Sequence, residues 1–213
     1  MAPCSHRWIE RSLLARAAVF QPFFTREAPR LAEACRNLAE RFLRGGRLLA
    51  FGRGAYATDA QHVAVEFTHP VIVGKRALPA SDLSALFGPW SGAVVRPEDA
   101  VMGFGPPQGD AEVRAALMEA AARGAMTFAL PGSDAAYAVE AASDDPFLHQ
   151  ESLELLYHVL WETVHVFFEH REVRHDAGVA GFLYPFLGER DRQAHNQPEF
   201  IEKESGRKEK EAD

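Results

Sequence analysis

The sequence predicts an α/β protein with a doubly wound parallel sheet. From Arg47 onward, short apolar runs alternate with segments of helical periodicity: the runs are RLLAFG, AVMGFG, MTFALPG and AYAVEA. Glycines and prolines separate these segments. Strands that alternate with helices pair in parallel through right-handed crossovers, with helices on both faces. A length of 213 residues fits one domain with one sizeable core.

Two helices are expected before the first strand. Residues 31–43 carry apolar side chains at i, i+3, i+4 and i+7 spacing, and Gly45-Gly46 ends that helix. An aromatic helix precedes it and is interrupted near Pro22. Their apolar surface exceeds what one small domain needs, so we expect a homo-oligomer, with a tetramer as the favoured state.

Three further helices follow. The first spans 58–69, with Thr58 or Asp59 as its N-cap. The second spans 110–123, begins at Asp110 and ends before Gly124. The third is a long helix from about 147 to 173 whose apolar positions cover more than half its circumference, which indicates burial in a helical bundle. An apolar segment at 178–188 and a disordered tail from 199 complete the chain.

Composition excludes several classes of protein. A formal net charge of −7 and the lack of a long Lys/Arg stripe argue against nucleic acid and an anionic membrane surface as partners. No run of about 18 apolar residues is present, so no membrane-spanning helix is expected. Cys4 and Cys35 lack a CxxC spacing, which suits a reducing cytoplasm, with Cys35 as a packing residue. His6, Arg7 and Glu10 stand where an export signal would be apolar.

The segment Asp59-Ala60-Gln61-His62 and Glu66 places an imidazole and a carboxylate one helical turn apart. Both groups are ordinary zinc ligands. On the last helix, Gln150 precedes His158 by eight residues, which is about 12 Å along the axis. These two side chains reach one ion only if they lean together or come from different subunits.

This order of elements, with the DAQH and QE motifs and the intervening GDAEVRAALMEAAARG and FALPG segments, resembles the sugar isomerase (SIS) domain over residues 30–172. The closest likeness is to the phosphoheptose isomerase group, which also contains binding proteins without known catalysis. The resemblance implies a five-stranded, flavodoxin-like parallel sheet. It places an N-terminal bundle in 1–45, the SIS domain in 46–175 and an apolar segment and tail in 176–213, as a single domain overall.

The resemblance also implies site residues. It gives a divalent metal, with zinc as the usual ion, to His62, Glu66, Gln150 and His158. It assigns catalysis to Glu66 as base and His158 as proton carrier, and substrate binding to Arg53, Tyr56, Asp110 and Gln150. The implied reaction is an aldose–ketose isomerisation of a carbohydrate derivative.

The two loops that should hold the sugar phosphate depart from the family pattern. Tyr56 stands at a serine position, and the second loop reads Gly105-Pro106-Pro107-Gln108-Gly109-Asp110 where the family has serines and a threonine. Prolines lack a backbone donor, and Asp110 opposes an anion at the helix start. Arg53 is either a new anion contact or an exposed side chain.

Two functions therefore stay open. One is a metal-dependent isomerase acting on a substrate without the usual phosphate. The other is a non-catalytic binding or assembly protein with a structural metal. The fold by itself does not decide between them.

Overall fold

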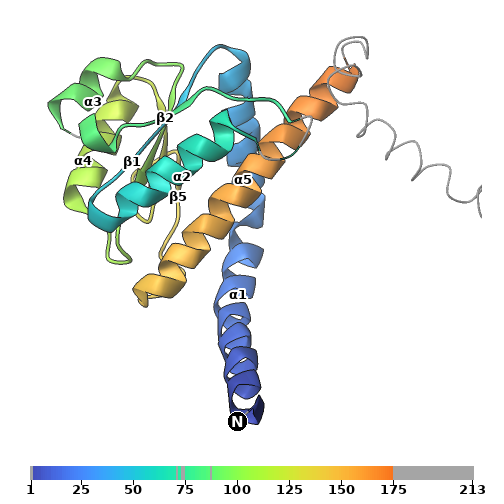
Figure 1. Ribbon diagram of the computed structural model, residues 1–213. Helices are drawn as coiled ribbons and strands as arrows, with labels where there is room; N and C mark the ends of the chain where they lie inside the picture. Colours follow the sequence, from blue (N-terminus) through green and yellow to red (C-terminus); the bar gives the residue numbers. More distant parts are fainter. Residues whose placement is uncertain (1, 71, 73–74, 87, 175–213) are drawn as a thin grey trace, which may run out of the picture. The chain divides into compact units, whose positions relative to one another are not determined.

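A computed structural model describes residues 2–70, 72, 75–86 and 88–174 (Figure 1). The chain divides into one unit of Met1–Val71 and Arg76–Phe168 and a second of Ile72–Lys75 and Glu169–Asp213. The sheet and the candidate site lie in the first unit. The expected segment at 178–188 and the tail from 199 lie outside the described residues. Among the helices that are described, none combines the length and apolar character needed to span a bilayer.

Five parallel strands form one sheet in the order β2-β1-β3-β4-β5. The strands are β1 (Leu48–Gly52), β2 (Ala80–Asp82), β3 (Ala100–Phe104), β4 (Met126–Leu130) and β5 (Tyr137–Ala138). Every residue of β1, β3 and β4 is buried, which explains why these strands are continuous apolar runs without alternation. The predicted parallel sheet is confirmed, and β2 is the short polar strand that no apolar run marked.

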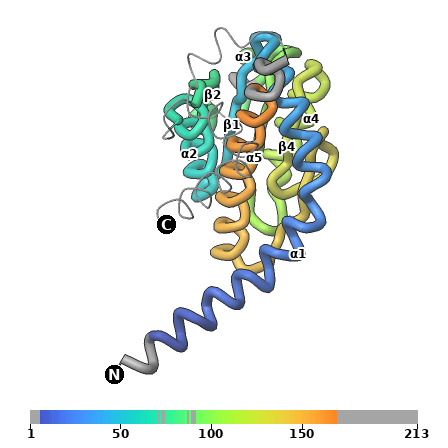
Figure 2. Tube along the Cα trace, turned by 90° about the vertical axis from the view of Figure 1, so that its right-hand side faces the viewer, coloured from blue at the N-terminus to red at the C-terminus, as the bar shows by residue number. Residues whose placement is uncertain are grey.

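Helices cover both faces of the sheet (Figures 1 and 2). On one face lie α1 (Ala2–Leu43), α2 (Ala57–Thr68) and α5 (Pro146–Arg174), and on the other lie α3 (Pro89–Val94) and α4 (Ala111–Ala122). Short 3-10 turns at Gly54–Tyr56 and Ser84–Leu86 follow β1 and β2. Because β1 and β3 are neighbours whose following helices take opposite faces, the ends of these two strands are where sheets of this kind bind ligands.

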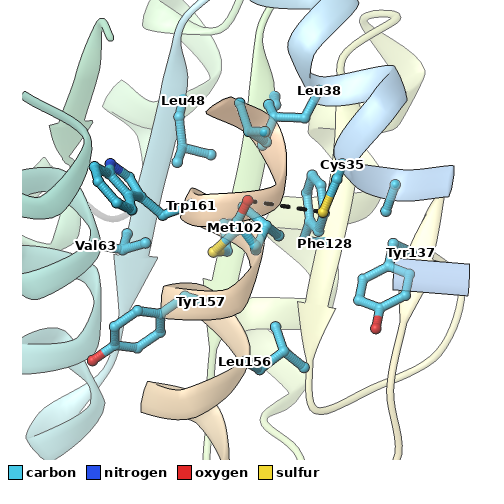
Figure 3. Close-up of a cluster of buried hydrophobic side chains, with 14 of the residues drawn as sticks. Cys35, Leu38, Leu48, Val63, Met102, Phe128, Tyr137, Leu156, Tyr157 and Trp161 are labelled. Carbon is cyan, nitrogen blue, oxygen red and sulfur yellow. Dashed lines mark hydrogen bonds between the residues drawn. The ribbon is translucent and has the colours of Figure 1, made fainter. Parts of the chain in front are cut away.

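The larger core lies between the sheet and the α1, α2 and α5 layer (Figure 3). Cys35 is fully buried there, with its Sγ 3.8 Å from the carbonyl oxygen of Leu160. Burial raises the pKa of its thiol to about 12, so the thiol stays protonated and acts as an apolar packing group. The expected long, buried last helix is likewise confirmed by α5.

The two helices expected before the first strand are one continuous helix, α1, with Pro22 and Pro29 inside it. Each proline removes one backbone hydrogen bond, a cost of about 3 kcal/mol in a helix interior. The second half of α1 contributes Leu31, Cys35 and Leu38 to the core, and this tertiary packing offsets the cost. The first half extends beyond the sheet (Figure 2).

The two sheet helices begin in different ways. Neither Thr58 nor Asp59 caps α2: its N-cap is Tyr56, which gives no side-chain hydrogen bond, and the Thr58 hydroxyl donates to the Ala55 carbonyl. The predicted cap of α4 is confirmed, because the Asp110 carboxylate accepts from the amides of Glu112 and Val113 at 2.8 and 3.0 Å.

Candidate metal centre and the two loops beside it

Three ligand-type side chains meet between α2 and α5. His62 Nε2 lies 3.4 Å from Glu66 Oε1, and His158 Nε2 lies 3.8 Å from the same oxygen. One nitrogen or oxygen from each residue lies within 4.8 Å of the other two. Two imidazoles and a carboxylate at this spacing are a ligand set suited to a divalent metal ion.

Local structure explains how the three side chains come together. His62 and Glu66 are one turn apart on α2, and the buried stripe of Ala60, Val63 and Phe67 fixes this helix on the sheet. The helix α5 runs beside α2 in the same direction and brings His158 to the same level (Figure 1). The side chains of His62, Glu66 and His158 keep 38, 17 and 42% of their surface exposed, so a small molecule can approach the cluster.

The fourth predicted ligand, Gln150, engages a different residue. Its Nε2 donates to Asp59 Oδ1 at 2.8 Å. Both residues lie nearer the N-terminal ends of α5 and α2 than His158 and Glu66 do. The amide oxygen is the atom with which Gln150 would bind a metal. The structure thus groups His62, Glu66 and His158 and pairs Gln150 with Asp59.

Asp59 is an acidic group that the sequence marked only as a cap. It is 1% exposed, and its Oδ2 has no hydrogen-bond partner in the described part of the chain. Burial, together with the charge of Glu154, raises its pKa to about 7, although the Gln150 hydrogen bond opposes the shift. Asp59 therefore loses its proton near neutral pH. No spacing in the sequence distinguishes such a carboxyl from an exposed one.

His149 is a second buried polar residue that sequence reasoning missed. Its Nε2 lies 3.0 Å from the carbonyl oxygen of Gly105, and a carbonyl only accepts, so Nε2 carries the proton. Its Nδ1 is buried without a partner among the described residues, and burial lowers the pKa of the ring. The Tyr56 ring lies edge-on at 6.0 Å. His149 and Tyr56 thus stand where the two loops approach α5.

Tyr157 touches the cluster from the core side. Its hydroxyl lies 2.8 Å from His62 Nδ1, and the residue is fully buried. Burial, with the charges of Asp59 and Glu154, raises its pKa well above the usual range, so it remains a neutral phenol. The sequence indicated it only as an apolar helix position.

The loop after β3 uses its own backbone donors. The Gly105 amide donates to Leu130 and the Gly109 amide to Pro106, at 3.0 and 2.8 Å. Pro106 and Pro107 have no donor. Asp110 occupies the first amides of α4, the position where a helix N-terminus would otherwise hold an anion.

Arg53, in the loop after β1, faces these acids. Its Nη1 lies 2.8 Å from Glu112 Oε1 and 3.5 Å from Asp110 Oδ2. Beside it an open hollow of about 390 Å³ is lined by Arg53, Gln61, Asp82 and Ser84, among others. The Ser84 hydroxyl already donates to Asp82 Oδ1 and accepts from the Gly52 amide. Charge around this hollow is thus mixed, with carboxylates beside the guanidinium.

The raised pKa of Asp59 predicts a pH dependence of folding stability that the substitution Asp59→Asn should remove. In the metal-free protein the folded state holds this proton up to about pH 7, whereas the unfolded carboxyl releases it near pH 4. The folded state therefore binds more protons in between, and stability falls as pH rises from about 4 to about 7. Asp59→Asn keeps the acceptor for Gln150 and should gain stability relative to the parent at pH 8 but not at pH 4.5. Urea midpoints at both values measure this, and an equal difference at both would contradict it.

Comparison with known proteins places this chain in a family. No family model matches the chain. The phosphoheptose isomerase of Solidesulfovibrio magneticus is 32% identical over 185 residues, which cover 76% of this chain and 89% of the relative. That of Pelobacter propionicus is 32% identical over 142 residues, which cover 59% of this chain and 75% of the relative.

Solved structures agree on the fold. A phosphoheptose isomerase from Neisseria gonorrhoeae superposes with a TM-score of 0.62 at 20% identity and covers 75% of this chain and 98% of its own. One from Francisella tularensis gives 0.61 at 20% identity, with 76 and 98% covered. Taken with the sequence identity over most of the chain, these likenesses show that the protein belongs to the SIS-domain family of phosphoheptose isomerase-like proteins.

Proposed function

We propose that this protein is a metal-dependent isomerase of the aldose–ketose type whose substrate lacks the usual phosphate. The observation that carries the proposal is the cluster of His62, Glu66 and His158, which is both suited to a divalent metal and half-open to solvent. An accessible coordination position is what separates catalytic zinc sites from closed structural ones. Zinc is the proposed ion, with Gln150 as a fourth protein ligand and the substrate at a fifth position, because a catalytic zinc ion can expand to five-coordinate.

The side chains of the cluster suit the proton transfers of such a reaction. An aldose–ketose isomerisation moves a proton between two carbons and adjusts the protons on two oxygens. Glu66 is the proposed base that removes the proton from carbon. His158, 3.8 Å away, is proposed to transfer protons to and from the substrate oxygens. A bound zinc ion would polarise the substrate carbonyl. Because a carboxylate bound to a metal is a weaker base, Glu66 would have to alternate between ligand and base.

The loops support a substrate without a phosphate group. The cradle that a phosphate needs is made of backbone amides at helix N-termini and of hydroxyls. Here Asp110 takes the first α4 amides, and the Ala57 amide at the start of α2 donates back to Gly54 and Ala55. Arg53 is balanced by Asp110 and Glu112. Carboxylates and amides around the hollow, such as Asp82 and Gln61, suit the hydroxyl groups of a neutral polyol.

A non-catalytic assembly protein with a structural metal is the second candidate. It is favoured by four large apolar side chains on the first half of α1, Trp8, Ile9, Leu13 and Leu14, each more than half exposed. A surface of this kind is typical of an interaction site. Oligomer formation accounts for the same surface, and the half-open cluster favours the enzyme.

Substitution of His62 tests the metal. The wild-type protein should bind about one zinc ion per chain, and His62→Ala should lose it because one of two imidazole donors is gone. The matched control is His69→Ala, since His69 is an exposed imidazole at the end of the same helix. Elemental analysis after dialysis measures the stoichiometry. Unchanged zinc content in His62→Ala would show that the site has been misassigned.

Proton exchange tests the reaction and the substrate class. In D₂O the zinc-loaded protein should introduce deuterium at C2 of unphosphorylated aldoses, and Glu66→Gln should slow this by about 10²-fold or more. Glu162→Gln, an exposed carboxylate on α5, should leave the rate unchanged. NMR follows the exchange. Exchange on no sugar at all would favour the assembly protein.

Sedoheptulose 7-phosphate serves as the comparison ligand. Calorimetry should show weak or no binding to the unmodified protein, and the double variant Tyr56→Ser with Asp110→Ser should bind it more tightly because donors return to both loops. Micromolar binding to the unmodified protein would mean that Arg53 or another group has replaced the cradle.

The apolar half of α1 predicts a homo-oligomer, with a tetramer built on residues 7–44 and 147–172 as the proposed form. Light scattering should report a particle of about four 23.5 kDa chains. Replacing Trp8 and Leu13 together by Glu should dissociate it, because both are exposed on this half. Met118→Glu, on the other face of the sheet, is the control. A stable monomer would rule out this assembly.

A further inference from the structure

Tyr157 lies at the meeting point of the core and the candidate metal centre. Its ring belongs to the buried apolar cluster, and its hydroxyl is directed toward α2 (Figure 3). There the oxygen lies 2.8 Å from His62 Nδ1. The other nitrogen of the same imidazole, Nε2, lies 3.4 Å from Glu66 Oε1. Tyr157 and the ligand cluster therefore contact opposite ends of one histidine ring.

From this geometry we infer that Tyr157 is a positioning residue for His62. The Tyr157 hydroxyl holds Nδ1 of His62 toward the core, and this presents Nε2 to Glu66 and His158. The inference rests on the proposed metal site, because the orientation of the His62 ring matters if His62 is a metal ligand. A histidine ligand is commonly held through its second nitrogen by a hydrogen bond, which fixes ring orientation and tautomer. Here the holding group is a phenol.

The chemistry of a phenol suits both states of the site. Without a metal, Nε2 keeps its proton toward the Glu66 carboxylate, and Nδ1 accepts a hydrogen bond from the Tyr157 hydroxyl. If Nε2 held a cation, the ring would carry its proton on Nδ1 instead, and Nδ1 would donate to the Tyr157 oxygen. A hydroxyl both donates and accepts, so one residue serves both tautomers without adding a charge next to the ion.

Packing fixes the place of this hydroxyl. The Tyr157 ring lies edge-on to Phe104 at 6.0 Å and to His158 at 5.0 Å. The residue is fully buried, as are Leu156 and Leu160 on the same helix. Close-packed side chains of this kind keep a single rotamer. The orientation of His62 is thus set by the core and by α5.

Tyr157→Phe is the test, because it removes the hydroxyl and keeps the ring. Zinc affinity, measured by competition with a chromophoric chelator, should fall about tenfold or more. In metal-free protein the nitrogen resonances of His62 should also shift, since Nδ1 loses its donor. A residue with only a packing role would move neither readout.

Tyr137→Phe is the matched control. Tyr137 is also a buried tyrosine, but its hydroxyl has no hydrogen-bond partner among the described residues, so its removal should change neither readout. Zinc affinity within about twofold of wild type in Tyr157→Phe, or unchanged His62 resonances, would overturn the inference. If wild-type protein binds no zinc, the proposed metal function fails, and the resonances of metal-free Tyr157→Phe still decide whether Tyr157 orients His62.

Discussion

The burial of α5 between α1, α2 and the sheet is the constraint on which the candidate site depends. Leu153, Leu156, Leu160 and Val164 of this helix are at most 1% exposed. Removing one such side chain costs about 2–5 kcal/mol in a close-packed core, so the helix has one position and one rotation. That position decides which α5 residues face α2, and it brings His158 beside Glu66 and Gln150 beside Asp59. The grouping of these side chains is therefore a consequence of core packing.

The loops show a different balance, between helix stability and anion binding. An aspartate at an N-cap stabilises its helix by about 1 kcal/mol, and Asp110 makes both amide contacts that this role requires. The same contacts use the donors that a phosphate would need. Arg53, which would otherwise attract an anion, lies 2.8 Å from Glu112. The loop after β3 thus has a capped helix start at the position where an anion would otherwise bind.

Much of the fold followed from local pattern. The buried strands were continuous apolar runs, and α4 and α5 had clear helical periodicity. The predicted start of α4 at Asp110 was correct. The division of α1 at Pro22 was wrong, because a local penalty was weighed without the packing that offsets it. The cap of α2 was wrong for a related reason: Asp59 had the right residue type, but its carboxylate pairs with Gln150 across 91 positions of sequence.

What the sequence determined by itself is whatever depends on spacing along one element: the buried strands as apolar runs, and the pairing of His62 with Glu66 one turn apart. The tertiary structure alone decided which residues of different elements meet. No local sequence pattern marks Tyr157, His149 or Asp59. Each of these residues is buried and contacts one partner on another part of the chain. Burial raises the pKa of Asp59, and core packing holds the Tyr157 hydroxyl against His62. Desolvation and rotamer choice are properties of the packed interior, so the spacing of residues along the chain does not predict them.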